Sequence, residues 1–289
     1  MKLRERWNYT LRNKRRLRTA KHFLFLLPSF AGVVCFVMLP FGKVVLSSFF
    51  NLLTGKFAGL QNYNAVFHNG AFLLAAANTV RFMAVGLPLL LLVSLSLALM
   101  ISGNPGLDKC KYLYLLPMAV PAATMVLVWK LLFSSQGFLN SFLGTHVDFL
   151  GEKSAFFILV GSYLWKNLGY TMVLWLAGLK SVPTEILDAA KVDGAGKIKV
   201  FFLITLPCLR GSMFTILVVS LLNSFKVFRE VYLVGGAYPQ RSIYMLQNVF
   251  SNWYVNLEHD KLAAAAVMLA VVLGAVSLLL QRLWDREER

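Results

Sequence analysis

The stretch TVRFMAVGLPLLLLVSLSLALMI, residues 79–101, is apolar almost throughout, with Arg81 as its single charged side chain. A helix rises about 1.5 Å per residue, so about 20 apolar residues cross the roughly 30 Å of hydrocarbon in a bilayer. A helix on the surface of a soluble domain would confine its apolar residues to one stripe. This stretch therefore predicts a helix that crosses a membrane.

Five further runs of the same kind can be read, which makes six in all. They cover about residues 23–39, with an extension through 44–50, and 112–133, 155–179, 212–234 and 262–283. Because the runs are continuous and lack the alternation of membrane strands, helices are favoured over a barrel. With 58% hydrophobic and 15% charged residues, the chain is predicted to be an all-α integral membrane protein. A basic tail, 1–21, precedes a single transmembrane domain, 22–289.

The net charge of +16 is explained by the position of the basic residues relative to the membrane spans, so it gives no reason to expect binding to nucleic acid. Most Lys and Arg residues fall in segments 1–21, 109–111, 180–210 and 282–289. Basic residues concentrate on the cytoplasmic side of membrane proteins. We therefore expect a multi-pass protein of the cell (cytoplasmic) membrane with both termini in the cytoplasm. The tail is expected to hold this orientation and to lie against anionic lipid.

The segment 180–210 is the longest predicted connection between spans on the cytoplasmic side. Glu185 suits the first turn of a helix, and Gly194 suits its left-handed end. A second short helix, about 197–203, would then lie against the membrane until Pro207 stops it. The segment reads as a helix-turn-helix with small residues facing the cytoplasm. Physical chemistry leaves two interpretations open, a docking site for another protein and a plain amphipathic connector.

The tetrapeptide GAGK, residues 194–197, looks like the end of a phosphate-binding loop. That loop needs glycine in place of Lys191 and Ser or Thr in place of Ile198, so the pattern fails. Any nucleotide energy must then come from another polypeptide, and no cofactor is expected in this chain. The histidines show no metal-ligand spacing, so no metal site is assigned.

The loop resembles the EAA loop of binding-protein-dependent ABC import permeases. The elements that carry the likeness are Asp188-Ala189-Ala190, Gly194, Ile204 and Leu206-Pro207, and their flanks are similar to the carbohydrate-uptake branch, the maltose-type and multiple-sugar permeases. Asp188 replaces the glutamate of the motif, which keeps the charge and shortens its reach.

Two external stretches extend the resemblance. The sequence GLQNY, residues 59–63, is similar to an element of the first external loop, and Asn78-Thr79 stands where the second core span of the family begins. The sequence LVGGAYPQRS, residues 233–242, is similar to a loosened Thr-x-Gly-Gly-Pro element. Its proline is delayed to Pro239.

The resemblance implies the type I, maltose-permease-like importer fold and a transport subunit rather than an enzyme. Its partners would be a second six-span permease, forming a heterodimer, two cytoplasmic ATPases that bind ATP and Mg²⁺, and an extracytoplasmic solute-binding lipoprotein. A coupling helix would enter a groove on the ATPase. The residues assigned to coupling are Glu185, Asp188, Ala189, Ala190, Asp193, Gly194, Ile204, Leu206 and Pro207.

Polar side chains within the predicted spans are candidates for the solute pathway, because burying them in hydrocarbon is unfavourable. Amide and hydroxyl groups match sugar hydroxyls, and aromatic faces stack on sugar rings. Hydrogen bonds between helices and anchoring at the interface are the competing interpretation. The candidates are Trp165, Asn167, Gly169 and Tyr170 in the fourth run, and Ser220, Asn223 and Ser224 in the fifth.

Four charged residues in the same runs are open to two interpretations. Lys226 and Glu230 are four apart and suited to pairing, and Lys226, Arg229 and Glu230 lie toward the outer end of the fifth run, where long side chains reach headgroups. If Lys166 and Lys226 faced a cavity instead, an acidic or phosphorylated solute would be favoured.

The leading hypothesis is therefore a permease subunit that imports a sugar or oligosaccharide. The alternatives are import of a non-sugar or phosphorylated solute such as glycerol phosphate, a stand-alone secondary transporter or channel, and a membrane enzyme. Few carboxylates inside the spans and the lack of an evident repeat disfavour a secondary transporter. An enzyme would need clustered carboxylates or histidines, and only Asp188 and Asp193 form a close pair.

Overall fold

The computed structural model describes residues 26–52, 54–107, 109–151 and 153–287. The basic tail predicted at 1–21 lies outside these residues. The described chain is helical, and its only extended pairing is an isolated bridge between Phe50 and Phe57. Its contacts divide it into two units, which we treat separately: unit 1 holds residues 1–66 and 258–271, and unit 2 holds 67–257 and 272–289.

Unit 1 contains the first apolar helix and the turn that follows it. The helical segment Leu26–Ser47 includes the π-helix η1 (Val34–Met38) and ends in α2 (Leu39–Ser47). The helix α3 (Gln61–Phe67) follows the turn. Asn62, from the GLQNY element, donates through Nδ2 to the carbonyls of Ser48 at 2.9 Å and Phe50 at 3.0 Å. One buried amide thus closes the turn, because it satisfies carbonyls that the helix end leaves free.

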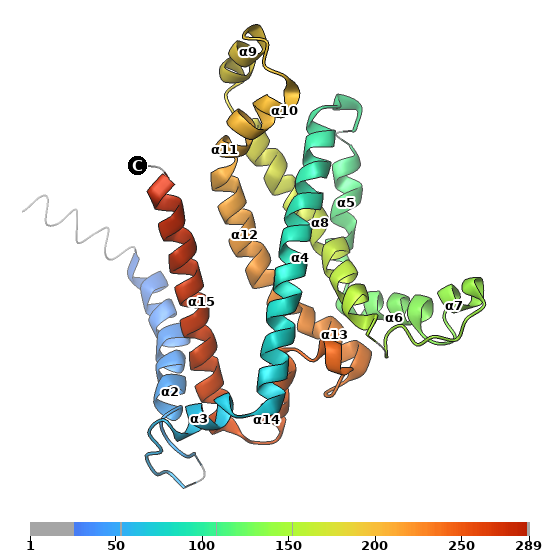
Figure 1. Cartoon of the computed structure of the whole chain (residues 1–289). Coiled ribbons are helices and arrows are strands. Elements are labelled where there is room, and N and C mark those ends of the chain that lie inside the picture. Colours follow the sequence, from blue (N-terminus) through green and yellow to red (C-terminus); the bar gives the residue numbers. More distant parts are fainter. Residues whose placement is uncertain (1–25, 53, 108, 152, 288–289) are drawn as a thin grey trace, which may run out of the picture. The chain divides into compact units, whose positions relative to one another are not determined.

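The helices of unit 2 hold both candidate sites (Figure 1). In chain order they are α4 (Gly70–Ser102), η2 (Pro105–Leu107), α5 (Cys110–Ala119), α6 (Ala122–Phe133), α7 (Phe138–Leu143), α8 (Ala155–Lys180), α9 (Thr184–Val192), α10 (Lys197–Val200), η3 (Phe201–Thr205), α11 (Leu206–Cys208), α12 (Arg210–Ser224), η4 (Phe225–Val227), α13 (Phe228–Gly235), η5 (Arg241–Ile243) and α14 (Leu246–Val255). The last helix, α15 (His259–Glu287), has residues in both units.

The helix α8 is the centre of unit 2, packing against α4, α5 and α12. Its Trp175 is 1% exposed and donates through Nε1 to the hydroxyl of Ser94 on α4 at 3.1 Å. Gly169 lets α5 come close, because a Cβ there would overlap the backbone carbonyl of Tyr114. Small residues permit such close helix crossings in membranes. The contacts of Trp175 and Gly169 hold α8, which lines the cavity described below, against α4 and α5.

Five helical segments within the described residues are long and apolar enough to cross a membrane: Leu26–Ser47, Gly70–Ser102, Ala122–Leu143, Arg210–Gly235 and His259–Arg282. The fourth predicted run, now α8, is not among them, although its 26 residues would extend about 39 Å. Lys166 and Asn167 lie near its middle and lower its hydropathy. The count of six spans therefore stays a prediction.

The third predicted run, 112–133, is not one continuous helix, and here the prediction was wrong. The helix α5 ends at Ala119 and α6 begins at Ala122, with Val120 in an extended conformation at ψ 125°. Pro121 causes the break because its ring disfavours a helical conformation in the preceding residue. Figure 1 shows α6 running across the end of α5 instead of continuing its axis.

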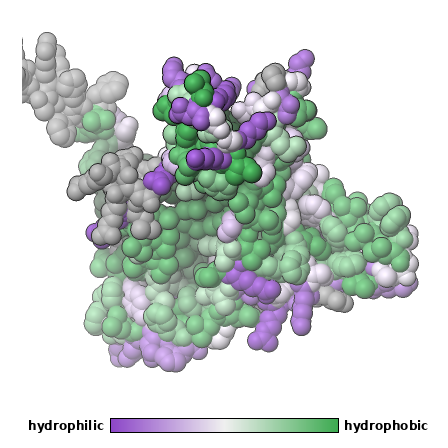
Figure 2. Space-filling model, turned by 45° about the horizontal axis from the view of Figure 1, so that its top comes forward, coloured by the Kyte–Doolittle hydropathy of each residue, from purple (hydrophilic) through white to green (hydrophobic). Residues whose placement is uncertain are grey.

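The second helix of the 180–210 loop also differs from its prediction. The helix α10 ends at Val200, and the π-helix η3 carries the chain to α11, which contains Pro207. Pro207 therefore does not stop the helical path. The π-helical turn changes the backbone hydrogen-bonding pattern just before Pro207, which has no N–H to donate. Figure 2 shows hydrophilic residues gathered around α9 and α10, beside a largely apolar surface.

Candidate functional site

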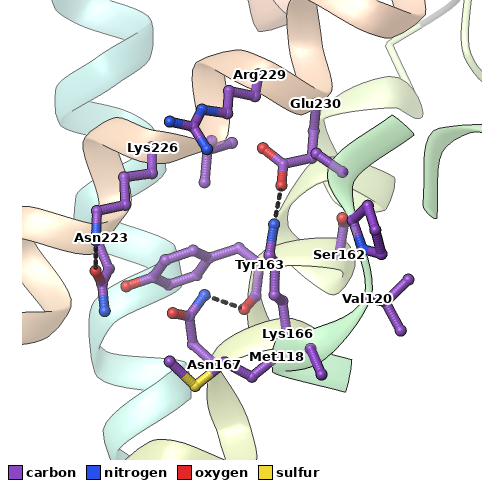
Figure 3. Close-up of a pocket in the computed structure, with 14 residues that line it drawn as sticks. Met118, Val120, Ser162, Tyr163, Lys166, Asn167, Asn223, Lys226, Arg229 and Glu230 are labelled. Carbon is purple, nitrogen blue, oxygen red and sulfur yellow. Dashed lines mark hydrogen bonds and ion pairs between the residues drawn. The ribbon is translucent and has the colours of Figure 1, made fainter. Parts of the chain in front are cut away.

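A cavity of about 330 Å³ lies in unit 2 between α8, the break between α5 and α6, and the region around η4 and α13. One side of the cavity is the helix break caused by Pro121. The other side is α8, which contributes Lys166 from halfway along its length. Figure 3 shows its polar side chains converging from α8 and from the η4–α13 turn. The lining residues are Met118, Ala119, Val120, Pro121, Ala122, Ser162, Tyr163, Lys166, Asn167, Asn223, Lys226, Val227, Arg229 and Glu230.

A buried ion pair crosses the cavity from α8 to α13. Lys166 Nζ lies 2.6 Å from Glu230 Oε1, and the two side chains are 27% and 7% exposed. The second carboxylate oxygen, Oε2, is buried and has no hydrogen-bond partner among the described residues. A buried charge needs a partner, so the pair fixes the distance between the two helices at this point.

Two further cations face the cavity beside this pair. Lys226 donates through Nζ to Asn223 Oδ1 at 2.8 Å. The pairing of Lys226 with Glu230 that their spacing of four residues suggested is therefore not formed. Arg229 is exposed to the cavity, and neither cation has an acidic partner in the described part of the chain. Three cations and one carboxylate thus line the cavity, which leaves it positively charged.

The neutral wall of the cavity is built from α8. Tyr163 is 2% exposed and donates its hydroxyl to the carbonyl of Ser220 at 2.8 Å, and this bond ties α8 to α12. Asn167 donates through Nδ2 to the carbonyl of Tyr163 at 2.8 Å. Its Oδ1 atom is left available to a ligand that can donate. Ser162 accepts a hydrogen bond of 3.1 Å from Nε1 of Trp129.

The predicted pathway residues divide into two groups. Asn167 and Asn223 line the cavity, whereas the other five, Trp165, Gly169, Tyr170, Ser220 and Ser224, do not. Trp165 packs edge-on against Trp129, and Gly169 serves the close crossing of α5 described above. Ser220 and Ser224 are buried, and the Ser224 hydroxyl donates to the carbonyl of Leu221 within its own helix.

Sequence reasoning missed the backbone segment 118–122 and two side chains, Ser162 and Tyr163. The signal for the first was the pair Pro117 and Pro121 inside an apolar run, which is typical of a broken helix. Ser162 and Tyr163 carried no such signal. Contacts between distant helices place them: Tyr163 bonds to Ser220 of α12, and Ser162 bonds to Trp129 of α6.

The second candidate site is the exposed helix α9 with the turn that follows it. Pro183 is its N-cap residue, and Glu185 lies in its first turn, as predicted for Glu185. Gly194 has φ +74°, which confirms the predicted left-handed end. The carbonyls of Lys191 and Ala190 accept hydrogen bonds from the N–H groups of Gly194 and Ala195. A rigid turn therefore holds α9 at the end of α8.

The predicted coupling residues share this region but differ in exposure. Ala190 is 8% exposed and forms the packed side of α9. Ile204, Leu206 and Pro207 are half-buried in η3 and α11, just before α12. The ion pair of Asp188 with Lys191 at 2.7 Å is well exposed, so it contributes little to stability. The fully exposed members are Glu185, Asp188, Ala189, Asp193 and Gly194.

The loop 236–245 is built as a rigid turn in spite of its delayed proline. Gly236 has φ +69°, and a Cβ on Gly235 would lie 2.6 Å from Cβ of the buried Pro239. Asn78 of α4 donates through Nδ2 to the carbonyls of Arg241 at 2.8 Å and Tyr244 at 3.0 Å. The position of Asn78 therefore fixes the loop to α4.

Residues 65–289 match the family described as the inner membrane component of binding-protein-dependent transport systems. The chain belongs to this family. It is accordingly a permease, an integral membrane transport subunit and not a catalytic enzyme. The match includes α9 and every residue that lines the cavity.

Similar proteins cover nearly the whole permease. It is 29% identical over 281 residues to the sn-glycerol-3-phosphate transport system permease protein UgpA of Yersinia enterocolitica, covering 92% of this chain and 95% of the relative. It is 31% identical over 275 residues to the trehalose/maltose transport system permease protein MalF of Thermococcus litoralis, covering 91% and 93%.

The fold of the permease is also found in solved structures. A chain of a bacterial ABC transporter involved in the import of the acidic polysaccharide alginate is 22% identical, with a TM-score of 0.79 over 94% of this chain and 98% of that chain. A second structure of the bacterial alginate ABC transporter contains an alginate pentasaccharide-bound periplasmic protein and has a TM-score of 0.78 at 23% identity, covering 94% and 96%. At this identity the likeness concerns the fold.

Proposed function

We propose that this permease forms half of the translocation pathway of an ATP-driven ABC importer that takes up a sugar or oligosaccharide. The observation that carries the proposal is the match to the importer family over residues 65–289. The uptake of trehalose and maltose named for one relative and the polysaccharide named for a solved structure support a saccharide as the solute.

The proposed assembly places this chain beside a second six-span permease. Two copies of a cytoplasmic ATPase would bind ATP and Mg²⁺, and an extracytoplasmic solute-binding lipoprotein would deliver the solute. A periplasmic protein in complex with the alginate transporter supports the last of these partners. The chain itself would cross the membrane six times, with α8 as its fourth span in chain order, and both termini would lie in the cytoplasm. The tail 1–21 would precede a transmembrane domain formed by 22–289.

We assign ATPase coupling to α9 and its turn. The exposed side of α9 carries Glu185, Asp188 and Ala189, and its small residues allow another protein surface to come close. The opposite side is held by Ala190, and Gly194 ends the helix sharply at φ +74°. The chain then enters the fifth span through Ile204, Leu206 and Pro207. Rigid-body movement of an ATPase would in this way displace α12.

We assign the solute pathway to the cavity between α8 and α13. Asn167 and Asn223 present amide groups to its interior, and amides bind sugar hydroxyls as donors and acceptors. Trp165, Gly169, Tyr170, Ser220 and Ser224 would act indirectly, by holding the surrounding helices. Tyr163 and Ser162 join the pathway because they line the same cavity.

The coupling assignment is tested in the complete importer. Cysteine placed at Ala189 should crosslink to the ATPase, and Gly194→Asp should abolish ATP-driven uptake while the protein still inserts. Gly196→Asp is the matched control, because it adds the same charge two residues away at φ −67° and should keep most of the uptake. Normal uptake by a well-inserted Gly194→Asp variant would overturn the assignment.

A further inference from the structure

We propose that the solute carried through this permease is an anion, a sugar or sugar derivative that bears a carboxylate or a phosphate, and that Lys226 and Arg229 bind its negative charge. The inference rests on the proposed function, because it names the solute class for the same cavity. It is carried by the charge, the geometry and the free hydrogen-bonding capacity of the side chains in Figure 3.

The charge of the cavity is unbalanced in a way that pairing within the chain does not remove. Lys166 and Glu230 neutralise each other at 2.6 Å. Lys226 and Arg229 remain, and neither has an acidic partner within the described residues. Both side chains are exposed, so a solute that enters the cavity can reach them. An anionic solute would supply the partner that these two side chains lack.

The two cations are placed to act together. They lie three residues apart on the η4–α13 turn and line one cavity, and Figure 3 shows both side chains extending from this one ribbon. Lys226 is held only by the neutral amide oxygen of Asn223 at 2.8 Å, and its ammonium group has two further protons to donate. Arg229 offers a guanidinium fork, which matches carboxylate and phosphate geometry.

The remaining polar atoms suit the hydroxyl groups of the same solute. Oε2 of Glu230 is buried and unpartnered among the described residues, so it lies out of reach of a solute in the cavity. Asn167 Oδ1, on the wall opposite the cations, offers an acceptor for a sugar hydroxyl. The cavity therefore presents cationic hydrogen-bond donors on one wall and an amide acceptor on the opposite wall, which fits an acidic saccharide or a phosphorylated sugar or polyol.

Lipid headgroups carry the same phosphate chemistry and are the competing occupant of Lys226 and Arg229. The position of the break at Val120 and Pro121 on the same cavity argues against this occupant. Backbone groups freed by a helix break at membrane depth are stable where they line water or protein. The cavity is thus shaped as part of an aqueous route, which a solute enters.

The experiment uses the complete importer, reconstituted in proteoliposomes with its partner permease, ATPase and binding protein. ATP-driven uptake is measured from a mixture of matched probes: trigalacturonate against maltotriose, and glycerol 3-phosphate against glycerol. We expect uptake of the carboxylated or the phosphorylated probe, and the two arms distinguish these sources of negative charge. ATP-driven uptake of a neutral probe with exclusion of both anions would overturn the inference and leave the proposed function standing. ATP-independent uptake of an anion would overturn the proposed function alone.

Charge variants then test the two residues. Lys226→Met and Arg229→Met should each lower the uptake rate of the anionic probe about 10- to 100-fold, the loss of one charge-assisted hydrogen bond. Lys130→Met is the matched control, because Lys130 is exposed in the last turn of α6 and does not line the cavity, and it should leave uptake unchanged.

A lipid role predicts a different pattern. Uptake by Lys226→Met would be unchanged, and added phosphatidylglycerol would raise the melting temperature of the native importer but not that of the variant. That pattern would overturn the inference. A melting temperature of the variant that responds to this lipid as the native protein does, together with the loss of anion uptake, would support it.

Discussion

Removing Lys166 should destabilise the permease more than removing Glu230, although the two side chains form one ion pair. The side chain of Glu230 is 7% exposed and that of Lys166 is 27% exposed. Lys166→Met leaves a buried carboxylate without its cation, a loss of about 3–5 kcal/mol. Glu230→Gln leaves a lysine that water can reach and keeps a hydrogen-bond acceptor, so we expect a loss of about 1–2 kcal/mol.

The double variant Lys166→Met, Glu230→Gln should regain part of this loss, because no buried charge is left unpaired. We expect its free energy of unfolding to lie about 1–2 kcal/mol below that of the native protein. The two single variants would then be non-additive by about 2 kcal/mol or more, as is found for residues in direct contact.

The assay is unfolding of the purified permease in mixed micelles of increasing sodium dodecyl sulfate, followed by tryptophan fluorescence. Lys261→Met is a matched control, since Lys261 Nζ lies at the same 2.6 Å from Glu258 but both side chains are about one-third exposed, at 36% and 35%. Its loss should cost about 0.2–1 kcal/mol. The reasoning fails if Lys166→Met is no more harmful than Lys261→Met, or if Glu230→Gln is the worse of the two cavity variants.

Two further predictions concern helix packing and the loop 236–245. Gly169→Ala should lower the free energy of unfolding by about 1–3 kcal/mol, because the new Cβ meets the Tyr114 carbonyl of α5; Gly161→Ala, with no atom within 4 Å of a Cβ there, should have no such effect in the same unfolding assay. Asn78→Ala should lower the free energy of unfolding by about 1–3 kcal/mol and speed proteolysis of loop 236–245. Asn104→Ala is the control, because the Asn104 side chain is exposed and bonds to Met100 at the end of its own helix, and it should change neither the stability nor the proteolysis. A loop that stays resistant to protease in Asn78→Ala would contradict the conclusion that Asn78 fixes the loop to α4.

Local features were predictable where a residue's own chemistry decides the backbone. The apolar run 79–101 lies within α4, and the helix begins earlier, at Gly70, because Asn69 Oδ1 accepts a hydrogen bond from the N–H of Phe72 at 3.0 Å. Gly194 adopts the left-handed conformation that its place after α9 predicted. Both features depend on contacts within a few residues, which sequence reasoning can follow.

The cavity was less predictable because it depends on contacts between distant segments. Lys166 and Glu230 are 64 residues apart, and the sequence favoured Lys226 as the partner of Glu230 from their spacing alone. The break at Pro121 was hidden because its neighbours are as apolar as those of an unbroken span. Asn167 and Asn223 were selected because polar groups inside spans are unfavourable, and both line the cavity. The same rule also selected Ser220 and Ser224, which are buried, and the role of all four in the solute pathway stays a prediction.

The break between α5 and α6 has a consequence for the bilayer around the permease. Val120 and Pro121 leave the helical conformation there. The Pro117 carbonyl accepts a hydrogen bond from the N–H of Val120 at 3.2 Å, but the other carbonyls in the last turn of α5 lack a following helical turn and need hydration instead. Water that reaches them shortens the dielectric barrier at this place to less than the full hydrocarbon thickness. An applied membrane voltage would consequently fall more steeply across the remaining apolar layer than across the cavity itself.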